Sequence, residues 1–161
     1  DAQESRGLGD VYKRQYKDRP VEFVKDIIGA EPDEIQAEIL NSVAENQLTS
    51  VRSGHGIGKS ALQSWLIIWF MCTRPFPKIP CTAPTKHQLH DILWAEVAKW
   101  LNPTLKTEIE WTQEKLYMKS NPENWFAVPR TATQPDALQG FHAEHILYII
   151  DEASRSKRCN I

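Results

Sequence analysis

Residues 51–60 read VRSGHGIGKS, and this glycine-rich stretch ending in Lys-Ser has the residue types that bind phosphate. Glycines let a backbone approach a ligand closely, and successive N–H groups before a helix form an anion-binding nest. In such a loop Lys59 would reach the β- and γ-phosphates of a nucleotide, and Ser60 would ligate Mg²⁺. The stretch departs from the template G-x-x-x-x-G-K-[ST] in having Ser53 where the first glycine belongs. The alternative is a chance glycine-rich turn. The predicted nucleotide-binding loop comprises Ser53, Gly54, His55, Gly56, Ile57, Gly58, Lys59 and Ser60.

A second stretch able to do chemistry is the apolar run 146–150, which is followed directly by Asp151 and Glu152. This is the Walker B form, in which the aspartate engages Mg²⁺ through its water shell. The adjacent Glu152 would polarise a water for attack on the γ-phosphate. The plainer alternative is a pair of solvated acids at the end of a strand. Together the two stretches predict Mg²⁺-dependent hydrolysis of the β–γ bond of ATP. Lys59 and Glu152 would be the catalytic residues, and Ser60 and Asp151 the metal-binding ones.

These groups have to be positioned by strands and helices, and the hydrophobic periodicity predicts both. Strands alternating with helices, the last strand being a near-continuous apolar run, predict an α/β fold with a mainly parallel sheet covered on both faces. Ligands of such sheets bind at the carboxyl ends of the strands, where both stretches fall. We expect helices within 20–47 in two pieces, at 59–72 and at 87–102, strands at 48–53, 80–84, 124–132 and 146–150, and a hairpin at 107–119.

The bulk composition narrows the function classes only modestly. The chain has 161 residues, enough for one domain with a real core. Its formal net charge of −2 gives no compositional case for nucleic-acid binding. The cysteines at 72, 81 and 159 lie far apart, which favours free thiols in a reducing compartment over disulfides or a zinc site. The best apolar run, 61–72, is shorter than the ~20 residues that span a bilayer, so we expect no membrane association.

The sequence at both ends of the chain departs from what a natural domain is expected to have. Residues 5–15, SRGLGDVYKRQ, match the translation of a sequencing-library adapter, so residues 1–15 are predicted to be non-native; the alternative is a basic N-terminal arm. After Asp151 the chain continues for only ten residues, although a central strand needs neighbours. Residues 16–161 are therefore predicted to be a gene fragment that is truncated after the Walker B strand.

The motifs, taken in order, resemble the ATPase domain of the large terminase subunit of tailed phages and prophages. The resemblance covers residues 32–154 and rests on PDEIQAEIL, VRSGHGIGKS, CTAPTKHQL, FAVPRTATQPDALQGFHAEH and ILYIIDEAS. It implies a P-loop NTPase fold related to helicases, and ATP hydrolysis that drives double-stranded DNA into a procapsid in the host cytoplasm. It also implies a homo-oligomeric ring, a small terminase subunit and a portal as partners, and a nuclease domain that this fragment lacks.

Several residues take roles by this resemblance. Gln36 matches the glutamine that reads adenine, the alternative being a surface helix glutamine. His55 stands where such loops often have an arginine that acts in cis. Thr85 and Lys86 match a motif for coupling or DNA contact, the alternative being a plain helix cap. His142 and His145 suggest a metal only weakly. A helicase-type ATPase and an inert truncated fragment remain alternatives, although Ala-Ser after Asp-Glu favours the terminase.

Overall fold

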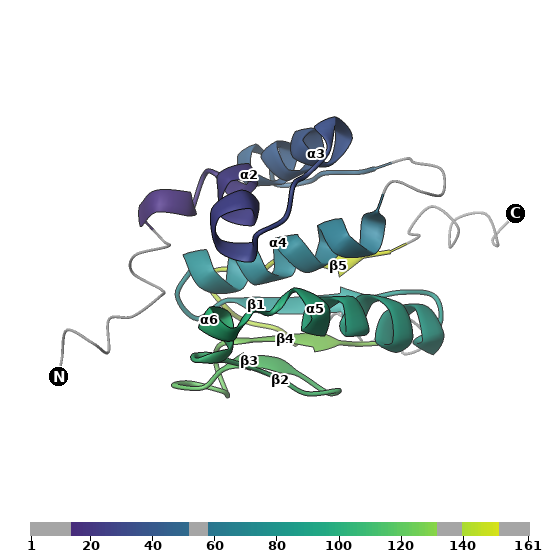
Figure 1. The fold of residues 1–161 in the computed structure, drawn as a ribbon. Helices are drawn as coiled ribbons and strands as arrows, with labels where there is room; N and C mark the ends of the chain where they lie inside the picture. Colours follow the sequence, from purple (N-terminus) through teal and green to yellow (C-terminus); the bar gives the residue numbers. More distant parts are fainter. Residues whose placement is uncertain (1–13, 52–57, 132–139, 152–161) are drawn as a thin grey trace, which may run out of the picture.

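A five-stranded sheet lies against a layer of helices, and a further pair of helices packs against one helix of that layer (Figure 1). The computed structural model describes residues 14–51, 58–131 and 140–151. The strand order across the sheet is β2-β3-β4-β1-β5. The strands are β1 Lys78–Thr82, β2 Ile109–Trp111, β3 Leu116–Met118, β4 Phe126–Pro129 and β5 Ile149–Ile150.

The helices begin and end at residues whose chemistry explains the boundary. Gly29, at φ 85°, ends the first helical piece. Asp33 caps α3 with its side chain, and Asn102 caps α6 in the same way, with a proline following it. Thr85 accepts the backbone N–H of Gln88 at 3.1 Å, so the helix cap given as the alternative for Thr85 is present, and its role in coupling or DNA contact stays a prediction. The helices are α2 Pro20–Phe23, the π-helical η1 Val24–Ile28, α3 Glu34–Glu45, α4 Lys59–Thr73, the π-helical η2 His87–Trp94, α5 Ala95–Trp100 and α6 Pro103–Lys106.

The sheet is mixed, so the prediction of a mainly parallel sheet was wrong. β1 pairs in parallel with β4 and with β5, whereas β3 pairs antiparallel with β2 and with β4. The hairpin predicted at 107–119 is present, but β3 extends the main sheet beside β4 instead of standing apart from it. Two of the four strand pairings are antiparallel for this reason.

Two of the strand predictions also need correction. In the predicted strand 48–53 the described residues 48–51 form no strand, and Leu48 is 86% exposed. A strand needs a ladder partner, and among the described residues β5 pairs with β1 alone. The predicted strand 146–150 is regular only in β5, with an isolated bridge at Ile146. It is also less buried than its apolar run suggested, because Tyr148 and Ile150 are about half exposed.

The two faces of the sheet differ. Leu116, Ala127 and Ile79 lie in one row across β3, β4 and β1, and all three are fully buried. The indole N–H groups of Trp111 and Trp125 donate to η2 and to α4, which places these helices on that same face. The described helices thus cover one face, whereas the expectation was helices on both. On the opposite face the Phe141 ring lies 6.4 Å from the Phe126 ring, measured between centroids, and residues 145–147 run beside Lys78 at the edge of the sheet.

Candidate nucleotide-binding site

The start of α4 has the geometry of an anion site. Gly58 precedes the helix in the left-handed conformation, at φ 69° and ψ 43°, and no side chain caps this helix end. The first intrahelical bond runs from Leu62 N to Gly58 O at 3.0 Å. The N–H groups of Lys59, Ser60 and Ala61 therefore have no acceptor within the helix and lie at its positive end. An anion at this position would satisfy them.

Lys59 and Asp151 come together here although 92 positions separate them in the sequence. The Lys59 Nζ lies 3.9 Å from the Asp151 Oδ1, and the two side chains are 39% and 22% exposed. Asp151 is fixed by its backbone N–H, which donates to Thr82 O at 3.0 Å and prolongs the β1–β5 ladder. An ion pair this exposed adds little stability, so it matters chiefly for position. It sets a lysine and a carboxylate side by side at the carboxyl end of a parallel strand.

Gln36 connects α3 to the end of the predicted loop. It is 7% exposed, which rules out the alternative of a surface glutamine. Its Oε1 accepts the backbone N–H of Asp33 at 3.0 Å, and its own N–H donates to Asp33 Oδ1 at 2.8 Å, which makes a capping box. Its Nε2 donates to Gly58 O at 3.4 Å. Gln36 therefore touches the backbone just before Lys59. Adenine reading by Gln36 stays a prediction.

Sequence reasoning overlooked Asp33, which orients Gln36 from the preceding turn. The signal was readable, because Asp33 and Gln36 have the D-x-x-Q spacing of a capping box. The structure places Ser60 beside Lys59 in the first turn of α4, where its carbonyl accepts the Ser64 hydroxyl at 2.6 Å. The other predicted site residues, Ser53, Gly54, His55, Gly56, Ile57 and Glu152, lie outside the described residues.

Other ionisable and metal-binding groups do not form a competing site. No group of three or more His, Cys, Asp or Glu side chains in the described part could hold a metal ion, which gives the weak suggestion at His142 and His145 no support. Cys72 and Cys81 are buried free thiols, in agreement with the prediction of free thiols for these two residues. Burial raises the pKa of both thiols. Within 14–51, 58–131 and 140–151, no helix is long and apolar enough to cross a membrane.

Fold and site together define an α/β protein with a candidate phosphate site at the carboxyl edge of its sheet. A curated protein of Enterobacteria phage P7, described as a probable large subunit of terminase, is 31% identical to this chain in an alignment of 137 residues that covers 80% of the chain. This match bears out the predicted resemblance, because the protein to which the chain is similar is itself described as a probable large terminase subunit. It spans 28% of that relative's length. No family model and no solved structure matches the chain.

Proposed function

We propose that this chain is the ATP-binding and ATP-hydrolysing part of a phage DNA-packaging motor. The observation that carries the proposal is the approach of Lys59 to Asp151 at the uncapped start of α4. A lysine, a row of helix N–H groups and a carboxylate are the groups that a nucleotide with its metal requires in a phosphate-binding loop. The relation to a terminase large subunit supports packaging as the use of that hydrolysis.

The residues present fit ATP and Mg²⁺. The N–H groups at the start of α4 and the Lys59 ammonium would bind the β- and γ-phosphates. The Ser60 hydroxyl and the Asp151 carboxylate are oxygen ligands of the kind that Mg²⁺ prefers. When bound, Mg²⁺ supplies positive charge beside the phosphate oxygens. Glu152, next to Asp151, would orient the attacking water, and Gln36 would position the loop and contact adenine.

The exchange of partners at Lys59 gives the mechanism its first step. In the structure the Lys59 ammonium and the Asp151 carboxylate lie 3.9 Å apart and partly neutralise each other. A bound nucleotide would attract Lys59 toward its phosphates and release the Asp151 carboxylate for the metal side of the site. Catalysis would then consist mainly of positioning and of neutralising charge, as phosphoryl transfer requires little covalent chemistry from the protein.

The wider assembly follows from the family. We infer double-stranded DNA as the substrate that is moved, a small terminase subunit and a portal as partners, and a homo-oligomeric ring as the working state. The place of action would be the cytoplasm of the bacterial host.

Nucleotide binding can be tested with a fluorescent ATP analogue and Mg²⁺, and hydrolysis with the full-length protein. Lys59→Ala and Asp151→Asn should each lower turnover by at least a hundredfold, because each removes a charge that the transferring phosphate needs. Lys99→Ala is the matched control, since Lys99 pairs with Glu96 on α5, away from the candidate site. Unchanged turnover in Lys59→Ala would show that this loop is not the phosphate site.

A further inference from the structure

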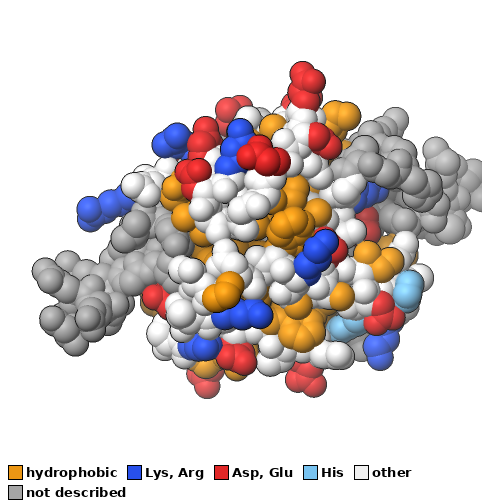
Figure 2. Space-filling model, viewed as in Figure 1, with side chains coloured by type: hydrophobic (Ala, Val, Ile, Leu, Met, Phe, Trp, Pro, Cys, Tyr) orange, Lys and Arg blue, Asp and Glu red, His pale blue; other side chains and the backbone are white. Residues whose placement is uncertain are grey.

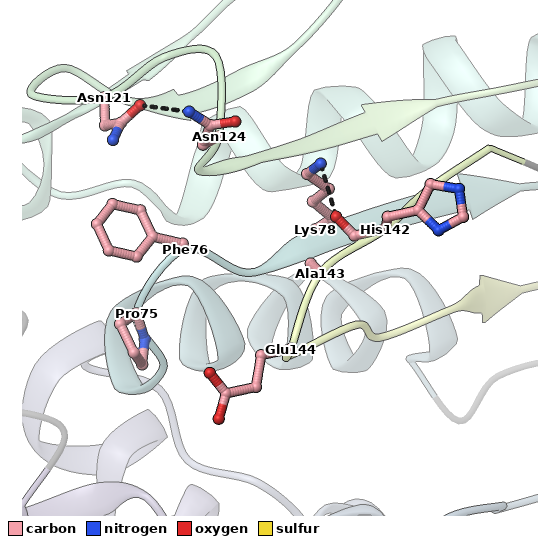
Figure 3. Close-up of a pocket in the computed structure, with 8 residues that line it drawn as sticks. All are labelled: Pro75, Phe76, Lys78, Asn121, Asn124, His142, Ala143 and Glu144. Carbon is pink, nitrogen blue, oxygen red and sulfur yellow. Dashed lines mark hydrogen bonds between the residues drawn. The ribbon is translucent and has the colours of Figure 1, made fainter.

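A hollow in the molecule lies at the opposite end of the strands from Lys59 and Asp151. It has a volume of about 440 Å³ and opens where β1 and β4 begin. Its lining includes Phe76, Lys78, Asn121, Asn124 and Glu144 (Figure 3). The hollow lies where the parallel strands begin, and the candidate nucleotide site lies where they end. A ligand in this hollow would therefore not touch the candidate nucleotide site. The proposed ATPase activity makes no use of these residues.

Phe76 is the unusual residue of this hollow. Its φ is 51°, in the left-handed region that bulky side chains avoid, and the side chain is nevertheless 50% exposed. The ring stands edge-on to Trp125, with 5.3 Å between ring centroids. Packing alone does not account for a strained backbone that holds an aromatic ring in solvent. Strain of this kind is concentrated at functional sites.

Two lysines extend the hollow across the face of the sheet opposite the helices. The register sets Lys78, Phe126 and Tyr117 in one row over β1, β4 and β3. The Lys115 Nζ lies 5.0 Å from the ring centroid of Phe126 and 5.4 Å from that of Tyr117, and the Lys78 Nζ lies 5.9 Å from that of Phe126. Within the described residues neither ammonium group has a carboxylate within 4.0 Å. The rings hold both charges in place without neutralising them.

The acids near this row do not cancel its charge. Glu110, which shares the face, is paired with Lys119 at 3.6 Å. The Glu144 carboxylate lies on the opposite side of the hollow from the Lys78 ammonium, which points toward the loop that carries Asn124 (Figure 3). Lys78 also donates to His142 O at 2.9 Å, which uses one of its three N–H groups.

We propose that the hollow and the two lysines bind a single strand of DNA. Lys78 and Lys115 would contact successive phosphates, and the exposed ring of Phe76 would stack on an unpaired base. Asn121 and Asn124 carry both donors and acceptors for a base edge. Cations interleaved with aromatic rings on a sheet face are the chemistry by which single-stranded nucleic acids are held. The choice of DNA rests on the proposed packaging function, whereas the preference for an unpaired strand rests on Phe76.

The face that carries α3 is a poor competitor for the same ligand. Acidic side chains gather over this part of the surface (Figure 2). Residues 31–51 contain five acids and no lysine or arginine, so their field repels phosphate. The acidic surface over α3 therefore disfavours a DNA strand, whereas Lys78 and Lys115 lie on the sheet face that the described helices leave uncovered.

The test is fluorescence anisotropy with a labelled single-stranded oligonucleotide and with its duplex, at several salt concentrations. Phe76→Gly suits the left-handed backbone and removes only the ring, so the fold should be kept. It should weaken single-strand binding about tenfold and leave duplex binding unchanged. Lys115→Gln should weaken single-strand binding and lower the slope of log K against log salt by about 0.7. Leu48→Gly and Lys106→Gln, at exposed positions elsewhere, are the controls and should bind as the unaltered protein does.

Two outcomes would overturn the inference. One is full single-strand affinity in folded Phe76→Gly and Lys115→Gln variants, with thermal melting confirming the fold. The other is equal loss in the two controls, which would indicate unspecific binding. Lys59→Ala should bind DNA normally, so failure of the ATPase proposal and failure of the DNA site give different results.

Discussion

Replacing Gly58 by alanine tests the contact between the Gln36 side chain and the start of α4. Gly58 has a φ of 69°, and a Cβ built there would lie 2.7 Å from Gln36 Nε2. A real Cβ does not approach a nitrogen that closely, so the end of the Gln36 side chain must move. That movement breaks the bond from Gln36 Nε2 to Gly58 O and disturbs the capping box with Asp33. Gly58→Ala should therefore destabilise the protein in two ways, through the strained backbone of a left-handed alanine and through the displacement of the Gln36 side chain.

The size of each effect can be worked from the geometry. A left-handed alanine costs about 1–2 kcal/mol relative to glycine. Displacing Gln36 costs about 1 kcal/mol more, because the broken bond is long and the capping box is weakened rather than lost. The sum is about 2.5 kcal/mol. For a protein of 161 residues this lowers the melting temperature by about 7 °C.

Gly29→Ala is the matched control. Gly29 has a φ of 85°, and a Cβ there meets nothing within 4 Å, so this variant carries the backbone strain alone. Differential scanning fluorimetry should place the melting temperature of Gly58→Ala about 3 °C below that of Gly29→Ala. In a Gln36→Ala background the difference should vanish. Equal melting temperatures of the two single variants, with Gln36 present, would refute the contact between Gln36 and the loop end.

Three further predictions follow from single contacts. Thr85→Ala should lower the melting temperature by about 3 °C, because the cap of η2 is worth about 1 kcal/mol; an unchanged melt would contradict this. Trp111→Phe should cost about 1 kcal/mol in chemical unfolding, because the indole N–H then no longer donates to Trp94 O at 3.0 Å; a stable variant would show that hairpin and η2 hold without it. Cys72 and Cys81 should resist alkylation at pH 8 in the folded protein, because burial raises the pKa of both thiols and keeps them protonated; peptide mass spectrometry that finds rapid labelling of either would contradict their burial.

Helices and the hairpin could be predicted because their signals are local. The two helical pieces predicted within 20–47 are present, separated by Gly29 with its φ of 85°, and the hairpin predicted at 107–119 is formed by β2 and β3. The membership of the hairpin in the main sheet could not be predicted in the same way. It depends on the pairing of Leu116 with Ala127, which nothing near the hairpin in sequence encodes. Non-local pairing, rather than propensity, made the sheet mixed.

In the candidate site, too, local features could be predicted from the sequence and non-local contacts could not. The spacing of residues alone predicts the phosphate loop and the Asp-Glu pair, and both assignments stay predictions. The buried state of Gln36 could not be predicted, because its neighbour Gly58 is 22 positions away. The exposure of Ile150 is another non-local property, since an apolar run is buried only where another element covers it.

Serine at position 53, where the template has a glycine, is compatible with nucleotide binding if the position of Lys59 does not depend on this residue. The closeness of Lys59 and Asp151 depends on two contacts that do not involve position 53. Gln36 contacts the backbone at Gly58, directly before Lys59. The hydrogen bond from the Asp151 backbone N–H to Thr82 O holds Asp151 in place. A loop whose end and whose facing carboxylate are both positioned from outside can vary at its first residue without moving Lys59. Ser53→Gly should therefore leave nucleotide affinity within twofold, whereas Gln36→Ala should lower it several-fold. The reverse ranking, measured with the fluorescent ATP analogue, would mean that the loop itself and not its supports sets the position of Lys59.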